Sequence, residues 1–321
     1  MLDFTSFLAP SISAYITYRE ASDRWNDSSY GPNLLLFDRY CIKHYPNAQE
    51  LTQEMVETWC RKRKTETNNS CRSRIYVVVS FIRYLRARGK TTVADPEIPR
   101  KEPREYIPHA FSEEELKNFF AACDAIPDTP PIEEQLSRRI TVPVFFRLLY
   151  SSGIRTTEAR LLRTEDVDLI HGVLNIRYSK GHDQHFVMLH DSMLELMKQY
   201  DTAISKQYPD REYFFPARNR NGGGHTRAWV QNNFRKMWFQ YNDSYAVPYE
   251  LRHNYAIENI NSWTNEGFGF SAKLLYLSKS MGHSVIESTK YYYSLVPGLA
   301  DILEACTDES AVIPEVDYES F

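Results

Sequence analysis

Four prolines lie close together about one third of the way along this 321-residue chain. Pro96, Pro99, Pro103 and Pro108 fall within 13 residues and are mixed with charged residues. Because proline lacks a backbone N–H and fixes φ, neither a helix nor a central strand can run through such a segment. We therefore expect residues 96–108 to form an extended, stiff linker with a separate domain on either side of it.

Helical spacing of apolar residues dominates the first 90 residues, which we expect to form a small bundle. The expected helices are Leu34–Ile42, one that begins near Thr52, and Arg72–Arg88. The last has an apolar stripe for burial, made of Ile75, Val78, Val79, Ile82 and Leu85. Its other faces carry Arg72, Arg74, Arg83, Arg86 and Arg88. Burial of the stripe should leave these guanidinium groups for solvent or for phosphate.

The net charge of −4 is distributed unevenly along the chain. Residues 61–90 carry ten lysines and arginines and one acid, whereas residues 301–321 carry seven acids and no base. Without those last residues the net charge would be +3. The sequence thus indicates a body that suits a polyanionic partner, followed by an acidic tail for which we expect disorder. Taken alone, the basic block is also compatible with an ordinary solvated helix face.

Several classes of protein are disfavoured by composition. No run approaches the ~18 apolar residues of a membrane span, and the first residues lack the basic start and apolar core of a signal peptide. The five cysteines, at positions 41, 60, 71, 123 and 306, are scattered and are not in metal-ligand spacing. We expect reduced thiols in a cytoplasmic protein.

Beyond the prolines, the pattern is again mainly helical. A capping box at Ser112–Glu115 predicts a helix start. An apolar helix over 141–152 is expected to end at Gly153, and a second to run from Thr156 through Leu162. Further helices are expected at Arg227–Gln240, Leu251–Asn259 and Lys273–Tyr293.

One short hairpin interrupts the helices. Val173–Tyr178 and His185–His190 are predicted as two strands around a turn over 179–184. The expected fold class is therefore mainly α with a small β-sheet. His182 and His185 could suggest a metal, but we interpret both as solvated residues of the turn.

Two arginines stand in settings that would aim them by backbone geometry. Arg155 lies between one helix stop and the next helix start, and Arg252 lies at the start of a predicted helix. Two guanidinium groups that converge on one phosphate can each donate two hydrogen bonds and stabilise a pentacoordinate transition state. Either arginine alone is more often a surface or ion-pair residue.

Tyr292, nine residues after His283, is the candidate nucleophile for such a phosphate. Its phenol, with an ordinary pKa near ~10, needs nearby positive charge or a base to attack. His283 would donate to the phosphate, and Lys180 in the predicted turn would protonate the departing oxygen. The plainer alternatives are packing tyrosines at 291–293, a structural histidine and an exposed turn lysine.

These motifs, in this order over residues 140–293, resemble those of the tyrosine recombinase, or phage integrase, family. The family's first arginine motif is matched by Gly153-Ile154-Arg155-Thr156-Thr157-Glu158-Ala159 and its catalytic-lysine turn by Ser179-Lys180-Gly181. Its second arginine motif is matched by Leu251-Arg252-His253-Asn254-Tyr255-Ala256. Its closing motif is matched by Met281-Gly282-His283-Ser284 and Ser288-Thr289-Lys290-Tyr291-Tyr292.

The resemblance implies a helical DNA core-binding domain at residues 1–95, the linker at 96–108, an α+β catalytic domain at 109–296, and a C-terminal helix with the acidic tail at 297–321. It implies cleavage and rejoining of DNA through a 3′-phosphotyrosyl intermediate, for integration and excision or transposition of a mobile element. The implied partners are double-stranded DNA with inverted-repeat core sites, a homotetramer on that DNA at the nucleoid, and accessory recombination proteins. No cofactor, metal or membrane is implied. The candidate DNA contacts are Arg61, Lys62, Arg63, Lys64, Arg72 and Arg74.

The chain departs from the family at one catalytic position. Tyr249 stands where the family usually has a histidine, three residues before the second arginine. A phenol can hydrogen-bond a phosphate oxygen, but it cannot shuttle a proton near neutral pH as imidazole does. We expect Tyr249→Phe to slow cleavage modestly and Tyr249→His to be tolerated, and abolition by both would contradict this role. Glu158 matches an acid that supports the first arginine, with an interaction with the helix dipole as the equal alternative.

Two other functions use related features. A type IB topoisomerase has a similar set of side chains, and efficient relaxation of plasmid that lacks a target site would favour it. A catalytically idle DNA-binding regulator is suggested by Tyr249, and a covalent DNA adduct that depends on Tyr292 would exclude it.

Overall fold

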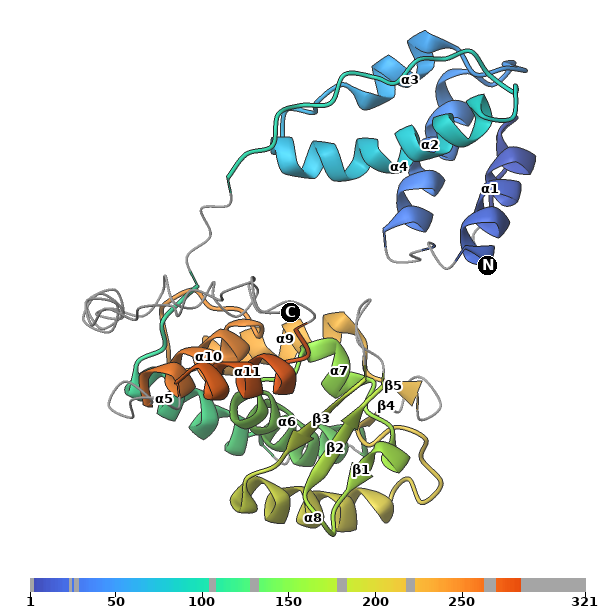
Figure 1. Ribbon diagram of the computed structural model, residues 1–321. Coiled ribbons are helices and arrows are strands. Elements are labelled where there is room, and N and C mark those ends of the chain that lie inside the picture. Colours follow the sequence, from blue (N-terminus) through green and yellow to red (C-terminus); the bar gives the residue numbers. More distant parts are fainter. Residues whose placement is uncertain are drawn as a thin grey trace, which may run out of the picture. The chain divides into compact units, whose positions relative to one another are not determined.

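The computed structural model describes residues 3–22, 25, 29–103, 108–127, 133–177, 184–217, 223–262 and 270–283. The chain divides into two compact units, Met1–Tyr106 and Ile107–Phe321, which are coloured blue to teal and green to red in Figure 1. The fold is mostly helical with small antiparallel sheets, which confirms the expected fold class. No helix among the described residues is long and apolar enough to cross a membrane.

The first unit is a bundle of α1 (Ala9–Ala21), α2 (Tyr30–His44), α3 (Gln53–Cys60) and α4 (Asn68–Arg86). Thr52 caps α3 and Thr67 caps α4, each by accepting the backbone N–H three residues on. The whole predicted stripe of α4 is buried and packs against α1, α2 and α3. The three predicted helices therefore form where expected, with ends shifted by a few residues.

Residues 91–103 lie along α4 instead of running free. Val93 is buried in the core of the first unit. Asp95 pairs with Arg83 and Arg86, and the Pro99 carbonyl accepts from Arg72 at 2.5 Å. At the N-terminus of α4, a Glu102 carboxylate oxygen accepts the Asn68 backbone N–H at 3.0 Å. The proline-rich segment is extended, as its composition predicts, but it is fastened to the helix at several points.

The second unit is built around one central helix. Its helices are α5 (Glu113–Asp124), α6 (Glu133–Ser152), α7 (Thr156–Arg160), α8 (Asp191–Ser205), α9 (Arg227–Trp238), α10 (Glu250–Ser262) and α11 (Phe270–Ser280). Helix α6 contacts α5, α7, α8 and α10 (Figure 1). The core is rich in aromatic rings that meet edge-on or tilted, including Phe119, Phe145, Phe146 and Phe234. The predicted capping box at Ser112 and Glu115 is present.

A three-stranded antiparallel sheet has the order β1 (Val167–Asp168), β2 (Val173–Ile176), β3 (His185–Met188). The two predicted strands form, and Val173 of β2 pairs with Met188 of β3. Strand β1 was not predicted. A short 3₁₀ turn, Thr164–Asp166, precedes β1, and a second small sheet pairs β4 (Pro216–Ala217) with β5 (Gly223–Gly224). Helix α11 packs against β3.

Two predicted helices end earlier than expected. Helix α7 stops at Arg160, not Leu162, and α11 stops at Ser280, within the segment Lys273–Tyr293 that was predicted to be helical. Gly282 follows α11 with φ of +63°, a conformation that ends helices and that side chains with a Cβ rarely adopt.

Cys41, Cys60, Cys71 and Cys123 are free thiols and are all buried. Burial raises the pKa of Cys41, Cys60 and Cys123 to about 12 each, so these groups stay protonated at neutral pH. Such thiols are unreactive, in agreement with the expectation of reduced cysteines. Cys306 lies outside the described residues.

Candidate active site

Gly153 begins the site, because it turns the chain between α6 and α7. Its φ is +64°, and a Cβ there would lie 2.2 Å from Cδ1 of Tyr255, so only glycine fits. The turn places Arg155 at the N-cap of α7 in an extended conformation. The side chain of Arg155 is therefore directed by the backbone, as the sequence setting predicted.

Glu158 fixes the orientation of Arg155. One carboxylate oxygen accepts from Arg155 Nη1 at 2.6 Å, and the other accepts the Arg155 backbone N–H at 2.7 Å. The side chain of Glu158 is fully buried. One carboxylate thus both caps the N-terminus of α7 and holds the guanidinium, so the two alternatives for Glu158 occur together. Arg155 Nη2 also donates to the carbonyl of Gly282 at 3.0 Å.

Arg252, in the first turn of α10, is 1% exposed. Its Nη1 donates to the carbonyl of Gly153 at 2.6 Å, and its Nη2 donates to the carbonyl of Met281 at 2.7 Å. The same Nη2 lies 2.9 Å from Nε2 of His283. Because a guanidinium can only donate, the Nε2 of His283 accepts, and this imidazole carries its proton on Nδ1.

The end of α11 places His283 beside Arg252. The His283 N–H bonds the Ser278 carbonyl and the Gly282 N–H bonds the Lys279 carbonyl, both at 2.9 Å. This pair of bonds around a glycine of positive φ is a Schellman motif. The motif reverses the chain sharply, so that the carbonyls of Met281 and Gly282 point to the two arginines.

The two arginine motifs and the Gly-His turn are therefore joined in one cluster. Arg252 binds the carbonyl of Gly153, the first residue of the first motif, and Arg155 binds the carbonyl of Gly282. Sequence reasoning named Arg155, Arg252 and His283 but not the role of the glycines. Both glycines could have been identified in the sequence, because Gly153 stands two residues before Arg155 and Gly282 stands directly before His283.

Tyr249 lies just before α10, one turn ahead of Arg252, and is 40% exposed. Its ring meets the ring of His253 edge-on, with centroids 5.0 Å apart. Burial lowers the pKa of His253 to about 4, so that imidazole is neutral at pH 7. Tyr249 is thus packed against a neutral aromatic ring, and a good part of it stays exposed.

His185 differs from its prediction as a solvated turn residue. It is the first residue of β3, 9% exposed, and its ring lies against Gly282. Inward residues of β3 alternate with the exposed Phe186 and Met188. Since both outward residues are apolar, β3 has no alternation of polar and apolar residues from which the burial of His185 could be predicted.

Lys180 and Tyr292 lie outside the described residues, as do His182, Tyr291, Tyr293 and the tail. Their roles therefore stay predictions. Within the described ranges, no group of three histidine, cysteine, aspartate or glutamate side chains could hold a metal ion.

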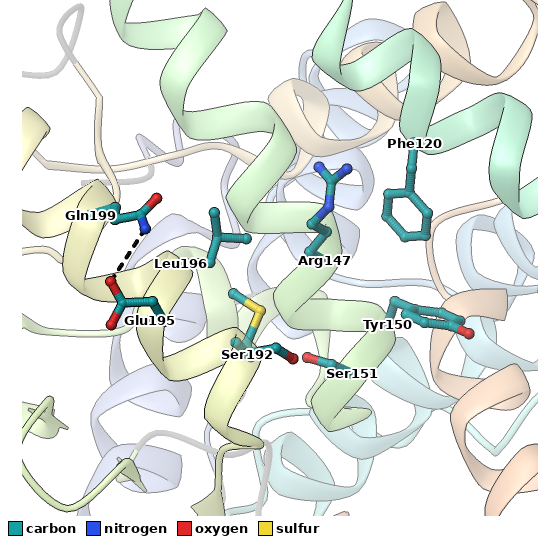
Figure 2. A pocket seen from close by; sticks show the side chains of 9 residues that line it. Phe120, Arg147, Tyr150, Ser151, Ser192, Glu195, Leu196 and Gln199 are labelled. Atoms are coloured by element: carbon teal, nitrogen blue, oxygen red, sulfur yellow. Dashed lines mark hydrogen bonds between the residues drawn. The ribbon is translucent and has the colours of Figure 1, made fainter.

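Figure 2 shows a pocket between α5, α6 and α8 that shares no residue with the cluster. Arg147 in its wall lies over the ring of Phe120, 5.0 Å from its centroid, and pairs with Asp124 at 2.7 Å. The positive charge of Arg147 is therefore paired with Asp124, and Arg147 does not belong to the cluster of arginines around Gly282.

In the first unit, the candidate DNA contacts have different environments. Arg61, Lys62, Arg63 and Lys64 are exposed in the connection between α3 and α4. Arg72 is half-buried and its guanidinium lies 5.2 Å from the ring of Tyr76. The expectation that the guanidinium of Arg74 faces solvent or phosphate is wrong, because Arg74 is 5% exposed.

Arg74 is held by the turn that precedes α4. Its Nη2 pairs with Glu66 at 2.7 Å, and its Nη1 donates to the Trp59 carbonyl at 2.5 Å. Arg74 is the main cause that lowers the pKa of Glu66 to about 2. These contacts close the connection between α3 and α4 over the helix face that carries Arg74.

Known proteins match the chain along most of its length. The model of the phage integrase family matches residues 110–297. The chain is 26% identical over 322 residues to the integrase/recombinase y4rE of Sinorhizobium fredii, which covers 97% of this chain and 98% of that protein. It is also 26% identical over 242 residues to the tyrosine recombinase XerC of Chlorobaculum parvum, covering 67% and 66%.

Two solved structures share the fold. The Tn1549 transposon integrase in complex with transposon right end DNA has a TM-score of 0.61 at 12% identity, over 96% of this chain and 100% of that one. A lambda integrase tetramer bound to a Holliday junction has a TM-score of 0.60 at 14% identity, over 90% and 78%.

Proposed function

The chain belongs to the phage integrase family of enzymes that cleave and rejoin DNA, and on this premise we propose that it acts as a site-specific recombinase with Tyr292 as its nucleophile. The observation that carries the proposal is the cluster of Arg155, Arg252 and His283. Three motifs from distant parts of the chain converge there, and backbone carbonyls hold both guanidinium groups.

In the proposed reaction, the phenolic oxygen of Tyr292 attacks the scissile phosphorus and the P–O bond to the 5′ oxygen breaks. The product is a 3′-phosphotyrosyl bond, and the 5′ oxygen leaves with a proton from Lys180. A 5′ hydroxyl from the partner strand then reverses the step and releases Tyr292. Because the phosphodiester energy is kept in the enzyme–DNA bond, the cycle needs no nucleotide. Arg155 and Arg252 stabilise the charge of both pentacoordinate states.

His283 and Tyr249 complete the proposed site. His283 now accepts a hydrogen bond from Arg252, so it can donate to phosphate through Nε2 only after that nitrogen gains a proton. Tyr249 contributes a hydrogen bond to a phosphate oxygen and no proton transfer, since its phenol is partly exposed and its ring neighbour His253 is neutral.

We further propose double-stranded DNA with inverted-repeat core sites as the substrate, bound by a homotetramer with accessory recombination proteins at the nucleoid. The exposed basic residues Arg61, Lys62, Arg63 and Lys64, together with Arg72, would contact the DNA backbone, which fixes position without reading sequence. The element served would be a mobile one, through integration and excision or transposition. The likeness to the Tn1549 transposon integrase supports this role without deciding among these outcomes.

A covalent-capture experiment tests the function without knowledge of the target. Sheared genomic DNA of the source organism is incubated with the protein, denatured, and the fragments that remain bound to protein are sequenced. We expect wild type to retain fragments that share inverted repeats around a short spacer, and Tyr292→Phe to retain none. Retention by Tyr292→Phe equal to wild type would contradict the assignment of the nucleophile, and relaxation of plasmid without the recovered site would favour a topoisomerase.

A further inference from the structure

The ring of His185 is the surface on which the Gly282–His283 turn rests. A Cβ at Gly282 would lie 2.5 Å from Cε1 of His185, 2.8 Å from Nδ1 and 3.0 Å from Nε2. The backbone of Gly282 therefore approaches the imidazole ring at Cε1 more closely than any other residue type would allow. His185 is buried at this contact and belongs to β3, which packs against α11.

The turn that rests on His185 supplies contacts to every member of the cluster. The Gly282 carbonyl accepts from Arg155, the Met281 carbonyl accepts from Arg252, and His283 follows directly. A displacement of this one turn would change the aim of both guanidinium groups at once. Errors of about 1 Å in such a site can slow a reaction by about 100-fold.

We propose that His185 is a positioning residue for strand cleavage, which seats the Gly282–His283 turn and thereby aims Arg155 and Arg252 at the scissile phosphate. The inference rests on the proposed recombinase function. His185 also stands five residues after Lys180 in the same predicted hairpin. The hairpin that carries the proposed acid is thus joined to the turn that carries His283 through one buried ring.

A double-mutant cycle between His185→Ala and Gly282→Ala tests the contact. Single-turnover cleavage is measured on the DNA site recovered by covalent capture, so that a smaller folded fraction lowers the amplitude and leaves the rate constant unchanged. We expect His185→Ala to cleave about tenfold slower, and Gly282→Ala about 100-fold slower, with DNA affinity within about twofold of wild type.

The double variant should cleave about tenfold faster than the product of the two single effects predicts. The reason is that the methyl group introduced by Gly282→Ala would enter the space that the imidazole ring has left. The cost of an alanine at positive φ is present in both backgrounds and cancels in the cycle. The matched control is Met188→Ala on the same strand, whose side chain is 69% exposed and which should cleave at the wild-type rate.

Two results would overturn the positioning role: cleavage by His185→Ala at the wild-type rate, or single effects that simply multiply in the double variant. A failure of the recombinase function itself is distinguishable, because wild type would then form no adduct that depends on Tyr292. His185→Phe gives a further check, since a flat ring of similar size should restore cleavage to within about threefold of wild type if seating the turn is the role of the ring.

Discussion

Arg74, Arg83 and Arg86 in the first unit and Arg252 in the second are held by different kinds of partner. In the first unit, Arg74 pairs with Glu66, and Arg83 and Arg86 share the carboxylate of Asp95. In the second unit, Arg252 donates to the carbonyls of Gly153 and Met281. A carboxylate cancels the charge of a guanidinium, whereas a carbonyl orients it and leaves the charge in place. The position of a positive charge in the sequence therefore says little about whether that charge is available to a phosphate.

Arg155 combines both arrangements. Its Nη1 meets the buried Glu158, while Nη2 donates to the Gly282 carbonyl. The carboxylate of Glu158 is also used by the Arg155 backbone N–H, which draws part of its charge to the helix N-terminus. The cluster thus keeps net positive charge while it is fixed in geometry, a combination that stabilises charge in a transition state.

Replacing Arg252 with lysine should produce the largest effect, because it keeps the charge and removes the planar fork that reaches two carbonyls. We expect single-turnover cleavage to slow by about 100- to 1,000-fold, with DNA binding little changed. Arg177→Lys is the control, since Arg177 is partly exposed and pairs with Glu165 and Asp166. A wild-type cleavage rate for Arg252→Lys would mean that the charge alone matters and that orientation by the two carbonyls does not.

Replacing Arg74 with methionine should instead affect stability. Loss of the partner leaves Glu66 largely buried and unpaired, which we expect to lower the free energy of unfolding by about 3 kcal/mol at neutral pH. The pKa of Glu66 is depressed to about 2, so the stabilisation is present above its ordinary pKa of 4.5 and is lost as pH falls from there towards 2.

Urea unfolding of wild type and Arg74→Met at several pH values measures this effect. The difference in free energy of unfolding between wild type and Arg74→Met should shrink as pH falls from 4.5 towards 2. A difference that stays constant down to pH 2 would show that packing of the arginine, and not its ion pair, is what the variant removes.

Replacing Asp95 with asparagine should have the smallest effect on stability, under about 1 kcal/mol, because Arg83 and Arg86 are both well exposed. It should release two guanidinium groups, so that DNA affinity rises and the slope of log K against log salt becomes steeper by about one to two. Glu97→Gln removes the same charge from an exposed neighbour. Equal changes for both variants would show that net charge, and not release of the arginines, is responsible.

Local signals in the sequence predicted most helices well. The capping box at Ser112, the helix start near Thr52 and the apolar stripe of α4 depend on residues within one or two turns, so the local sequence is enough to predict them. The convergence of Arg155, Arg252 and His283 was inferred from the phosphate chemistry that these residue types share and from the family resemblance, because no local pattern relates residues so far apart in the chain.

Other features depend on contacts between distant segments. The burial of Arg74 requires the carbonyl of Trp59 and the carboxylate of Glu66, which a helical pattern cannot place. The environment of His185 requires the approach of Gly282 from 97 positions away along the chain. Gly282 itself, inside the segment Lys273–Tyr293 that was predicted to be helical, was visible as a helix-ending residue.

The proline-rich segment along α4 has a practical consequence for dissecting the protein. A fragment cut at residue 90, where helical character ends in the sequence, would lose Val93 from its core and the Glu102 carboxylate from the start of α4. A fragment that ends at residue 95 would still lose the Glu102 carboxylate. The first unit should therefore be expressed with its prolines attached, through residue 106, and a trimmed version that binds DNA poorly would report a damaged bundle instead of a weak interface.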